Sequence, residues 1–133
     1  KQAKAGNYLC LQVFLSPSQE TDGAVNGLRE VLARQYALPV TCGYGPRYLH
    51  STGQLHKGDA GNGLFIQLTQ DFSLDVDVPD SIGEEKSFLT FSALKAAQAK
   101  GDRQALTEAG RRIIRIHFKK NPVDGLKTIV NGL

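Results

Sequence analysis

The sequence predicts one α+β domain in which strands and helices follow one another in the order β-α-β-β-α-β. Four short segments have the pattern of strands, and longer segments between them repeat apolar residues with the period of a helix. Glycine, proline or acidic residues separate these segments. The order is the split arrangement of ferredoxin-like domains, a two-layer sandwich, here with an extra short helix and a C-terminal helix. A three-layer α/β arrangement is the alternative.

The first half of the chain supplies two strands and one long helix. Residues 8–15 (YLCLQVFL) alternate between two faces, as a strand does. Residues 19–36 carry Val25, Leu28 and Leu32 at helical spacing, so we expect a helix there. A second strand begins at Pro39 and runs into a glycine-rich stretch.

The third strand is expected over residues 63–69 (GLFIQLT), and the acidic residues 70–87 that follow it are expected to form an exposed loop. Thr90 or Ser92 can cap the next helix. Gly101 is expected to end that helix.

The last part of the chain supplies a short helix, the fourth strand and a final helix. Asp102 is expected to cap the short helix, which Gly110 stops. Residues 111–120 alternate as a strand with two faces. Residues 120–133 form a C-terminal helical extension, for which Asn121 and Pro122 are a good N-cap and first-turn pair.

One face of the predicted sheet, which carries Leu9, Leu11 and Val13, is apolar enough for the helices to cover. The opposite face mixes aromatic with basic side chains, which indicates a docking or binding face or a layer covered by the C-terminal helix. An ordinary amphipathic sheet with basic side chains at its rim is equally compatible. The docking candidates are Tyr8, Phe14, Phe65, Arg115 and His117.

Composition bounds the class of protein. The chain has 133 residues, enough for one domain with a real core, and no apolar run long enough to span a membrane. Its net charge of +3 permits an anionic partner but is too small to require nucleic acid. Without a secretory signal, Cys10 and Cys42 are expected to be buried thiols in a cytoplasmic protein. The start without methionine suggests a single domain, residues 1–133, cut from the C-terminal part of a longer enzyme.

Residues 43–63 are the stretch with the most potential chemistry. Six of the fourteen glycines fall here, and such density lets a backbone present N–H groups to an anion. Neither the P-loop pattern nor GxGxxG is present, so a hairpin loop with structural glycines is the alternative, and the one that spacing favours. His50, His56 and Asp59 lack the spacing of a metal site, and we expect no metal or cofactor. The candidate donors to a phosphate or sugar are Arg47, His50, Ser51, Thr52, Gln54, His56 and Lys57.

Four motifs together resemble a known family. GYGPRYLHSTGQLHKGD, NGLFIQLT, FSALKAAQAKGDRQAL and GRRIIRIHF are similar to the C-terminal region of bifunctional transaldolase/glucose-6-phosphate isomerases and of isomerase-only relatives. The similarity covers roughly residues 6–118. Two departures stand out: Asp59 occupies the place of a second glycine, and the chain continues through NPVDGLKTIVNGL.

The resemblance implies a parent enzyme that interconverts glucose 6-phosphate and fructose 6-phosphate, a proton transfer that needs a general acid and base. The family's catalytic Glu, His and Lys belong to an upstream sugar-isomerase core, so no catalytic residue is assigned here and the chain alone is expected to be inactive. The implied partners are that core and a sugar phosphate, and association into oligomers is left open. The alternatives are an RRM-like nucleic-acid-binding module, against which low charge and the missing RNP1 pattern speak, and a small-molecule-binding ferredoxin-like domain.

Overall fold

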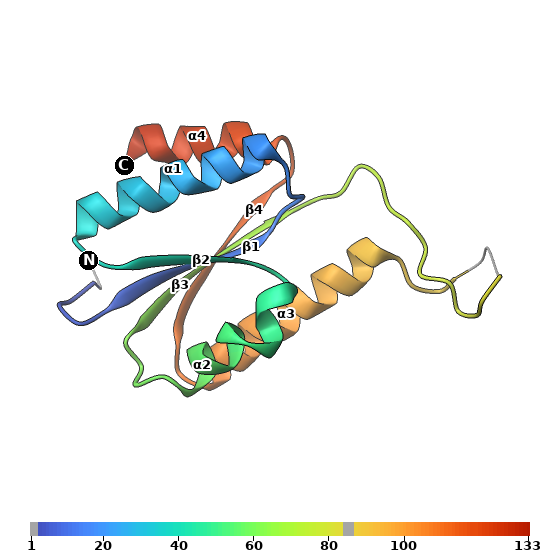
Figure 1. The fold of residues 1–133 in the computed structure, drawn as a ribbon, viewed down its shortest axis with the longest axis horizontal. Coiled ribbons are helices and arrows are strands. Elements are labelled where there is room, and N and C mark those ends of the chain that lie inside the picture. Colours follow the sequence, from blue (N-terminus) through green and yellow to red (C-terminus); the bar gives the residue numbers. More distant parts are fainter. Residues whose placement is uncertain (1–2, 84–86) are drawn as a thin grey trace.

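The computed structural model describes residues 3–83 and 87–133, in which helices alternate with the strands of one sheet (Figure 1). The predicted mixed α/β class is confirmed. The elements are β1 (Tyr8–Phe14), α1 (Gln19–Tyr36), β2 (Val40–Tyr44), the 3₁₀ helix η1 (Arg47–His50), α2 (Thr52–Gly58), β3 (Gly63–Gln70), α3 (Phe91–Glu108), β4 (Arg112–Phe118) and α4 (Pro122–Gly132).

The four strands are parallel and lie in the order β2-β1-β3-β4. Leu11 of β1 stands between Cys42 of β2 and Ile66 of β3, and Ile66 pairs with Ile114 of β4. Parallel neighbours need crossover connections, and here helices lie on both faces of the sheet (Figure 1). The layers are therefore those of the three-layer alternative. The physical reason is that η1 and α2 join β2 to β3 as a crossover, where a hairpin loop would have paired the two strands.

Helices α1 and α4 cover the face that the sequence marked as apolar. Leu11 and Val13 are fully buried against Val25 and Leu28 of α1, as predicted, and Leu126 of α4 completes this core. The caps are also as predicted for the final helix, where the Asn121 side chain accepts a hydrogen bond from the Val123 amide at 2.9 Å. The C-terminal helix thus packs on α1 as part of this core.

Helices α2 and α3 cover the opposite face, so the predicted docking face of the described sheet is closed. Phe65 packs with Leu106 of α3, and Phe14 packs with Tyr48 of η1 and Ala99 of α3. The expected break at Gly101 is absent: α3 is one helix of 18 residues that begins after the Thr90 cap. Glycine costs only about 1 kcal/mol in a helix interior, which burial of residues on both sides of it offsets.

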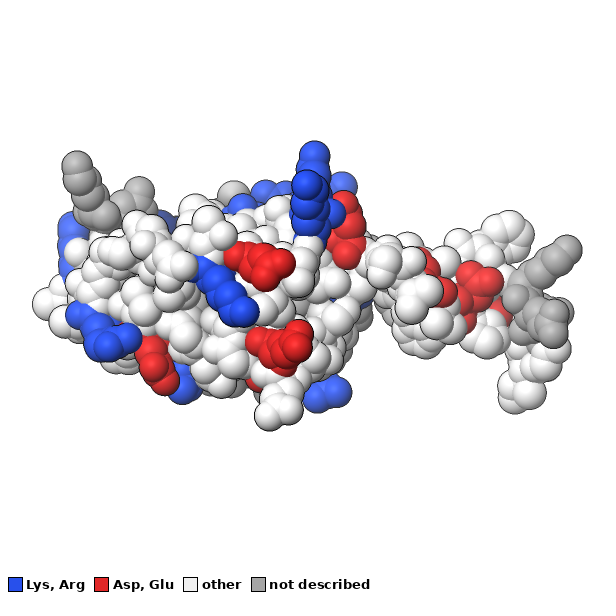
Figure 2. Space-filling model, turned by 90° about the horizontal axis from the view of Figure 1, so that it is seen from above, with Lys and Arg blue, Asp and Glu red and all other residues white. Residues whose placement is uncertain are grey.

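Residues 71–83 and 87–90, here called the arm, project from the body (Figure 1), as expected of an exposed acidic loop. Hydrogen bonds between Val78 and Leu89 at 2.8 Å and between Phe91 and Val76 at 2.9 Å hold the base of the arm. The side chains of Ile82 and Phe88 beyond it are fully exposed. On the face seen in Figure 2, the arm carries acidic side chains while the body carries both signs of charge.

Across the described residues, none of the helices combines the length and apolarity that a membrane crossing requires.

Candidate functional site

The glycine-rich segment leaves the sheet at the carboxyl end of β2 and turns back over the sheet as η1 and α2. Of its six glycines, only Gly61 adopts a positive φ. Others are required because a side chain would clash with a neighbouring ring. A Cβ on Gly45 would lie 2.4 Å from the Phe14 ring, and one on Gly63 would lie 2.6 Å from the Phe65 ring. The glycines are therefore structural, as spacing favoured, but the segment forms the helical turns η1 and α2 of a crossover and is neither a hairpin loop nor an anion cradle.

Asp102 of α3 is the buried centre that holds this segment. Its side chain is 2% exposed and lies 2.7 Å from the Lys57 ammonium. The Tyr48 hydroxyl donates to the other Asp102 oxygen at 2.9 Å. Burial and the neighbouring carboxylate raise the pKa of Tyr48 far above its usual value. Because a lone buried carboxylate would be costly, these two partners and Asp102 stabilise one another.

His56 completes the interior of what we call the Asp102 cluster, together with Tyr48, Lys57 and Asp102. Its ring centroid lies 5.1 Å from that of Phe65, and its Nε2 lies 3.6 Å from the Cys10 sulfur. Burial lowers the pKa of His56, against the pull of Asp102, and burial raises the pKa of Cys10 to about 11. A neutral imidazole beside a protonated thiol is not an activated nucleophile. Cys10 is buried as expected, whereas Cys42 is exposed because β2 is an edge strand.

Asp59 fixes the far end of the segment. It accepts a hydrogen bond from the Tyr8 hydroxyl at 2.7 Å and pairs with Arg111 at 3.1 Å. The Arg111 guanidinium also donates to the backbone oxygens of Lys57 and Asp59, at 2.8 and 2.7 Å. Burial by itself would raise the pKa of Asp59, but the hydrogen bonds from Tyr8 and the Gly61 amide outweigh it, so that pKa lies below its usual value.

The candidate donors of the segment therefore separate into two sets. His56 and Lys57 belong to the buried side. The remainder, here called the donor strip, are exposed: Arg47, His50, Ser51, Thr52 and Gln54. Arg47 and His50 are three residues apart on the 3₁₀ helix η1, where such residues eclipse one another, so both point the same way. Neither has a hydrogen bond or ion pair with any described residue.

His50 and His56 thus lie on opposite sides of the segment. Among the described residues, no group of three or more His, Cys, Asp or Glu side chains is placed to hold a metal ion.

The predicted docking face is covered by helices, and its residues contact other parts of the chain instead of a partner. Phe14 and Phe65 are 2% exposed beneath η1 and the helices, and Tyr8 is bound to Asp59. Rings so deeply buried cannot stack on bases, so these residues do not form the surface that an RRM-like module requires. Arg115 and His117 lie at the rim, beside α3, where they line a small cavity.

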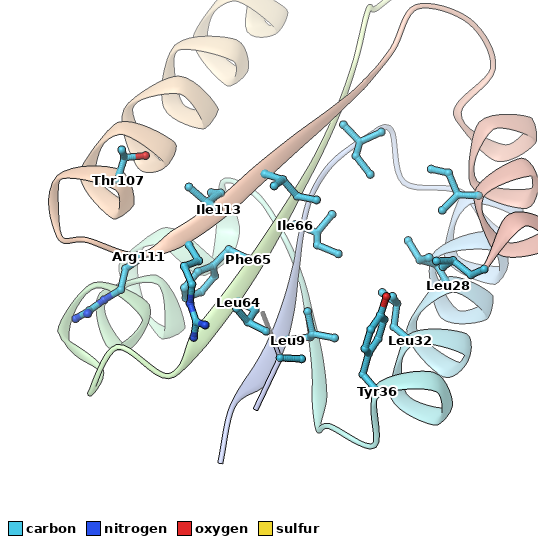
Figure 3. Close-up of a pocket in the computed structure, with 16 residues that line it drawn as sticks. Leu9, Leu28, Leu32, Tyr36, Leu64, Phe65, Ile66, Thr107, Arg111 and Ile113 are labelled. Atoms are coloured by element: carbon cyan, nitrogen blue, oxygen red, sulfur yellow. The ribbon is translucent and has the colours of Figure 1, made fainter. Parts of the chain in front are cut away.

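An apolar groove lies beside the uncovered part of β4 and extends around that edge strand from α1 to Thr107 of α3 (Figure 3). Its volume is about 600 Å³. Ile66 and Ile113 line it from the sheet, Leu32 and Tyr36 from α1, and Arg111 stands at one end. Ile114 of β4, on the sheet face that we expected the helices to cover, is 58% exposed and lines the groove.

Sequence reasoning missed Asp102 as the anchor because it placed a helix end at Gly101. In one continuous helix, residues 99, 102 and 106 fall on a single stripe, and Ala99 and Leu106 are buried there with Asp102. An acidic residue on an otherwise apolar stripe was the overlooked signal, because it indicates a buried carboxylate with a partner.

Comparison with known proteins shows the fold alone. No protein-family model and no curated protein matches the chain. Among solved structures, a hypothetical protein from Thermus thermophilus is similar, with a TM-score of 0.73 and 19% sequence identity over 92% of this chain. The chain spans about a third (33%) of the length of that protein. The likeness therefore supports the α/β architecture and carries no function across.

Proposed function

We propose that this chain is the C-terminal domain of a glucose-6-phosphate isomerase, of the bifunctional transaldolase type or the isomerase-only type, that works in the cytoplasm. Its role there is accessory. It presents the donor strip to the sugar phosphate and docks on the upstream sugar-isomerase core, which supplies the catalytic acid and base.

The observation that carries the proposal is that motifs far apart in the sequence meet in one place. Tyr48 and Lys57 come from the GYGPRYLHSTGQLHKGD motif and converge on Asp102 of the FSALKAAQAKGDRQAL motif. Arg111, from the GRRIIRIHF motif, binds the carbonyl oxygens at the end of α2. These contacts hold the donor strip on a rigid support, as a ligand-positioning site requires.

The position and chemistry of the donor strip fit a sugar phosphate. The strip follows the carboxyl end of β2, the side of an open α/β sheet where ligands bind. Arg47 offers a fork of donors suited to phosphate oxygens, and Ser51 and Thr52 offer hydroxyls suited to a sugar. His56, the histidine of the Asp102 cluster, is buried and lines a cavity with Cys10 and Thr52 beside the strip.

The apolar groove supplies the docking surface that the covered sheet face does not. A groove of about 600 Å³ lined by isoleucine and leucine side chains is an apolar surface of the kind that domain interfaces bury. We assign the sugar-isomerase core as its occupant, because in this proposal the core lies in the same chain.

The test uses the full-length parent chain with Arg47→Ala, and Arg34→Ala as the matched control. Arg34 is exposed on α1, and its side chain donates to the Glu30 carbonyl at 3.4 Å. Loss of a charged hydrogen bond of about 1.5–3 kcal/mol predicts a fall in kcat/KM for glucose 6-phosphate of about 10- to 100-fold for Arg47→Ala, and none for the control. Unchanged kcat and KM in Arg47→Ala would remove the donor strip from substrate binding, and isomerase turnover by the isolated chain would refute the accessory role.

A further inference from the structure

A small cavity with several polar side chains in its lining lies between α3 and the carboxyl ends of β3 and β4. Its volume is about 80 Å³. The polar side chains that line it include Gln67, Thr69, Lys95, Lys100, Arg115 and His117. None of them belongs to the donor strip or to the Asp102 cluster, so this cavity is separate from the site of the proposed function.

The cavity concentrates positive charge. Lys95 and Lys100 face it from α3, and Arg115 faces it from β4. Asp71, on the arm, binds the His117 ring at 3.0 Å, and Asp75 lies beside Lys95 and Phe72 in an adjoining cavity. Three cations line the cavity and, among the described residues, no carboxylate does, so the lining carries an excess of positive charge, which favours an anion.

The basic groups are held in place but retain donors. Lys95 spans the end of the sheet to donate to the Leu15 carbonyl at 2.9 Å, and its ammonium lies 4.8 Å from the centre of the Phe72 ring. Arg115 donates from Nε to the Thr69 hydroxyl at 3.2 Å, and its two terminal nitrogens have no partner among the described residues. Burial also lowers the pKa of Lys95, and a bound anion would offset that cost.

Gln67 adds a buried hydrogen-bond acceptor to the cationic lining of the cavity. Its side chain is fully buried, and its Nε2 donates to the Ala99 carbonyl at 2.9 Å, which fixes the orientation of the amide. The Oε1 atom of Gln67 has no hydrogen-bond partner among the described residues. Because an unpaired buried acceptor is costly, a ligand that brings an O–H donor as well as negative charge would satisfy Gln67.

We propose that the cavity binds a phosphoryl group that carries a hydroxyl, for which inorganic hydrogen phosphate is the simplest case. A volume of about 80 Å³ is enough for a phosphoryl group. Arg115 and the lysines bind the anionic oxygens, and the P–OH group donates to Gln67. Sulfate has the same shape and charge but no proton to donate near neutral pH, so the cavity selects phosphate over sulfate.

The test is a titration of the chain with inorganic phosphate at about pH 7.5 and constant ionic strength, followed by NMR shifts of backbone amides in α3 and β4. Sulfate is the matched ligand. One hydrogen bond to a buried acceptor predicts that phosphate binds about tenfold more tightly than sulfate. Arg115→Gln, at an exposed position, is expected to weaken phosphate binding about tenfold or more, and Arg47→Gln in the donor strip is expected to leave it unchanged.

A second variant, Gln67→Met, removes the acceptor and is expected to abolish the preference for phosphate while both anions still bind. Equal binding of phosphate and sulfate by the unaltered chain would overturn the proposal, as would phosphate binding that Arg115→Gln does not weaken. If Gln67→Met does not fold, the phosphate/sulfate comparison and the Arg115 variant decide the matter. Because Arg47 serves as the control here, failure of this site is distinguishable from failure of the donor strip.

Discussion

Replacement of Asp102 is the most direct perturbation of the cluster that holds the glycine-rich segment. Asp102→Ala removes both the acceptor of the Tyr48 hydroxyl and the counter-charge of Lys57. Removing one partner of a fully buried pair costs about 3–5 kcal/mol. The Lys57 side chain is 26% exposed and can turn toward water, so its share of this cost is smaller. The orphaned Tyr48 hydroxyl adds about 1–3 kcal/mol. We therefore expect a loss of about 2–4 kcal/mol in the free energy of unfolding.

Urea denaturation of the chain, with Glu30→Ala as an exposed control, measures this loss. Asp102→Asn keeps an acceptor for Tyr48 and loses only the charge, so its cost should fall between those of the other two variants. Adding Lys57→Met to Asp102→Asn removes the unpaired cation and should recover part of the loss. A change in Asp102→Ala within about 0.5 kcal/mol, as expected of an ordinary surface substitution, would refute the view that Asp102 anchors the segment.

Two further predictions concern the packing and the pH dependence of the same region. Gly45→Ala places a Cβ into the Phe14 ring and should lower the free energy of unfolding, measured by urea denaturation, by about 1–3 kcal/mol. Gly101→Ala has open space around it inside α3 and should raise that free energy by about 0.5–1 kcal/mol. The opposite order of stabilities would contradict the packing. The folded pKa of His56 lies below its unfolded value of 6.5, so the unfolded chain binds more protons in acid and stability is lost as the pH falls below 6.5. Between about pH 7.5 and pH 5.5 the loss should reach up to about 1.4 kcal/mol and should be absent in His56→Gln; an equal loss in that variant would exclude His56 as its source.

Separating the donor strip from the Asp102 cluster changes what a substitution in this segment reports. Lys57→Ala acts on a residue that fastens α2 to α3, so any loss of activity in the parent would combine stability with binding. Arg47→Ala acts on an exposed side chain without a partner among the described residues, so its effect on kcat/KM would report on ligand contact alone. Comparing the two variants therefore separates residues that hold the segment in place from residues that contact the ligand.

The local features of the fold were readable from the sequence. The spacing of Val25, Leu28 and Leu32 predicted the buried stripe of α1, because a helix brings those positions to one side. The alternation in residues 8–15 predicted two faces of β1, and the acidic residues after β3 predicted an exposed arm. The candidate list around residues 47–57 contained the whole donor strip, though it could not separate the exposed side chains from His56 and Lys57.

Only the tertiary structure decided how these faces meet. The alternation along a strand assigns side chains to two faces but does not say whether the next strand runs parallel or antiparallel. The crossover through η1 and α2 makes the strands parallel. It also brings a second helical layer over Phe14 and Phe65. The Asp102 cluster joins residues 54 positions apart in sequence, and the polar cavity joins β3, β4 and α3. Such contacts arise from packing between distant elements, and periodicity, a local property, does not encode them.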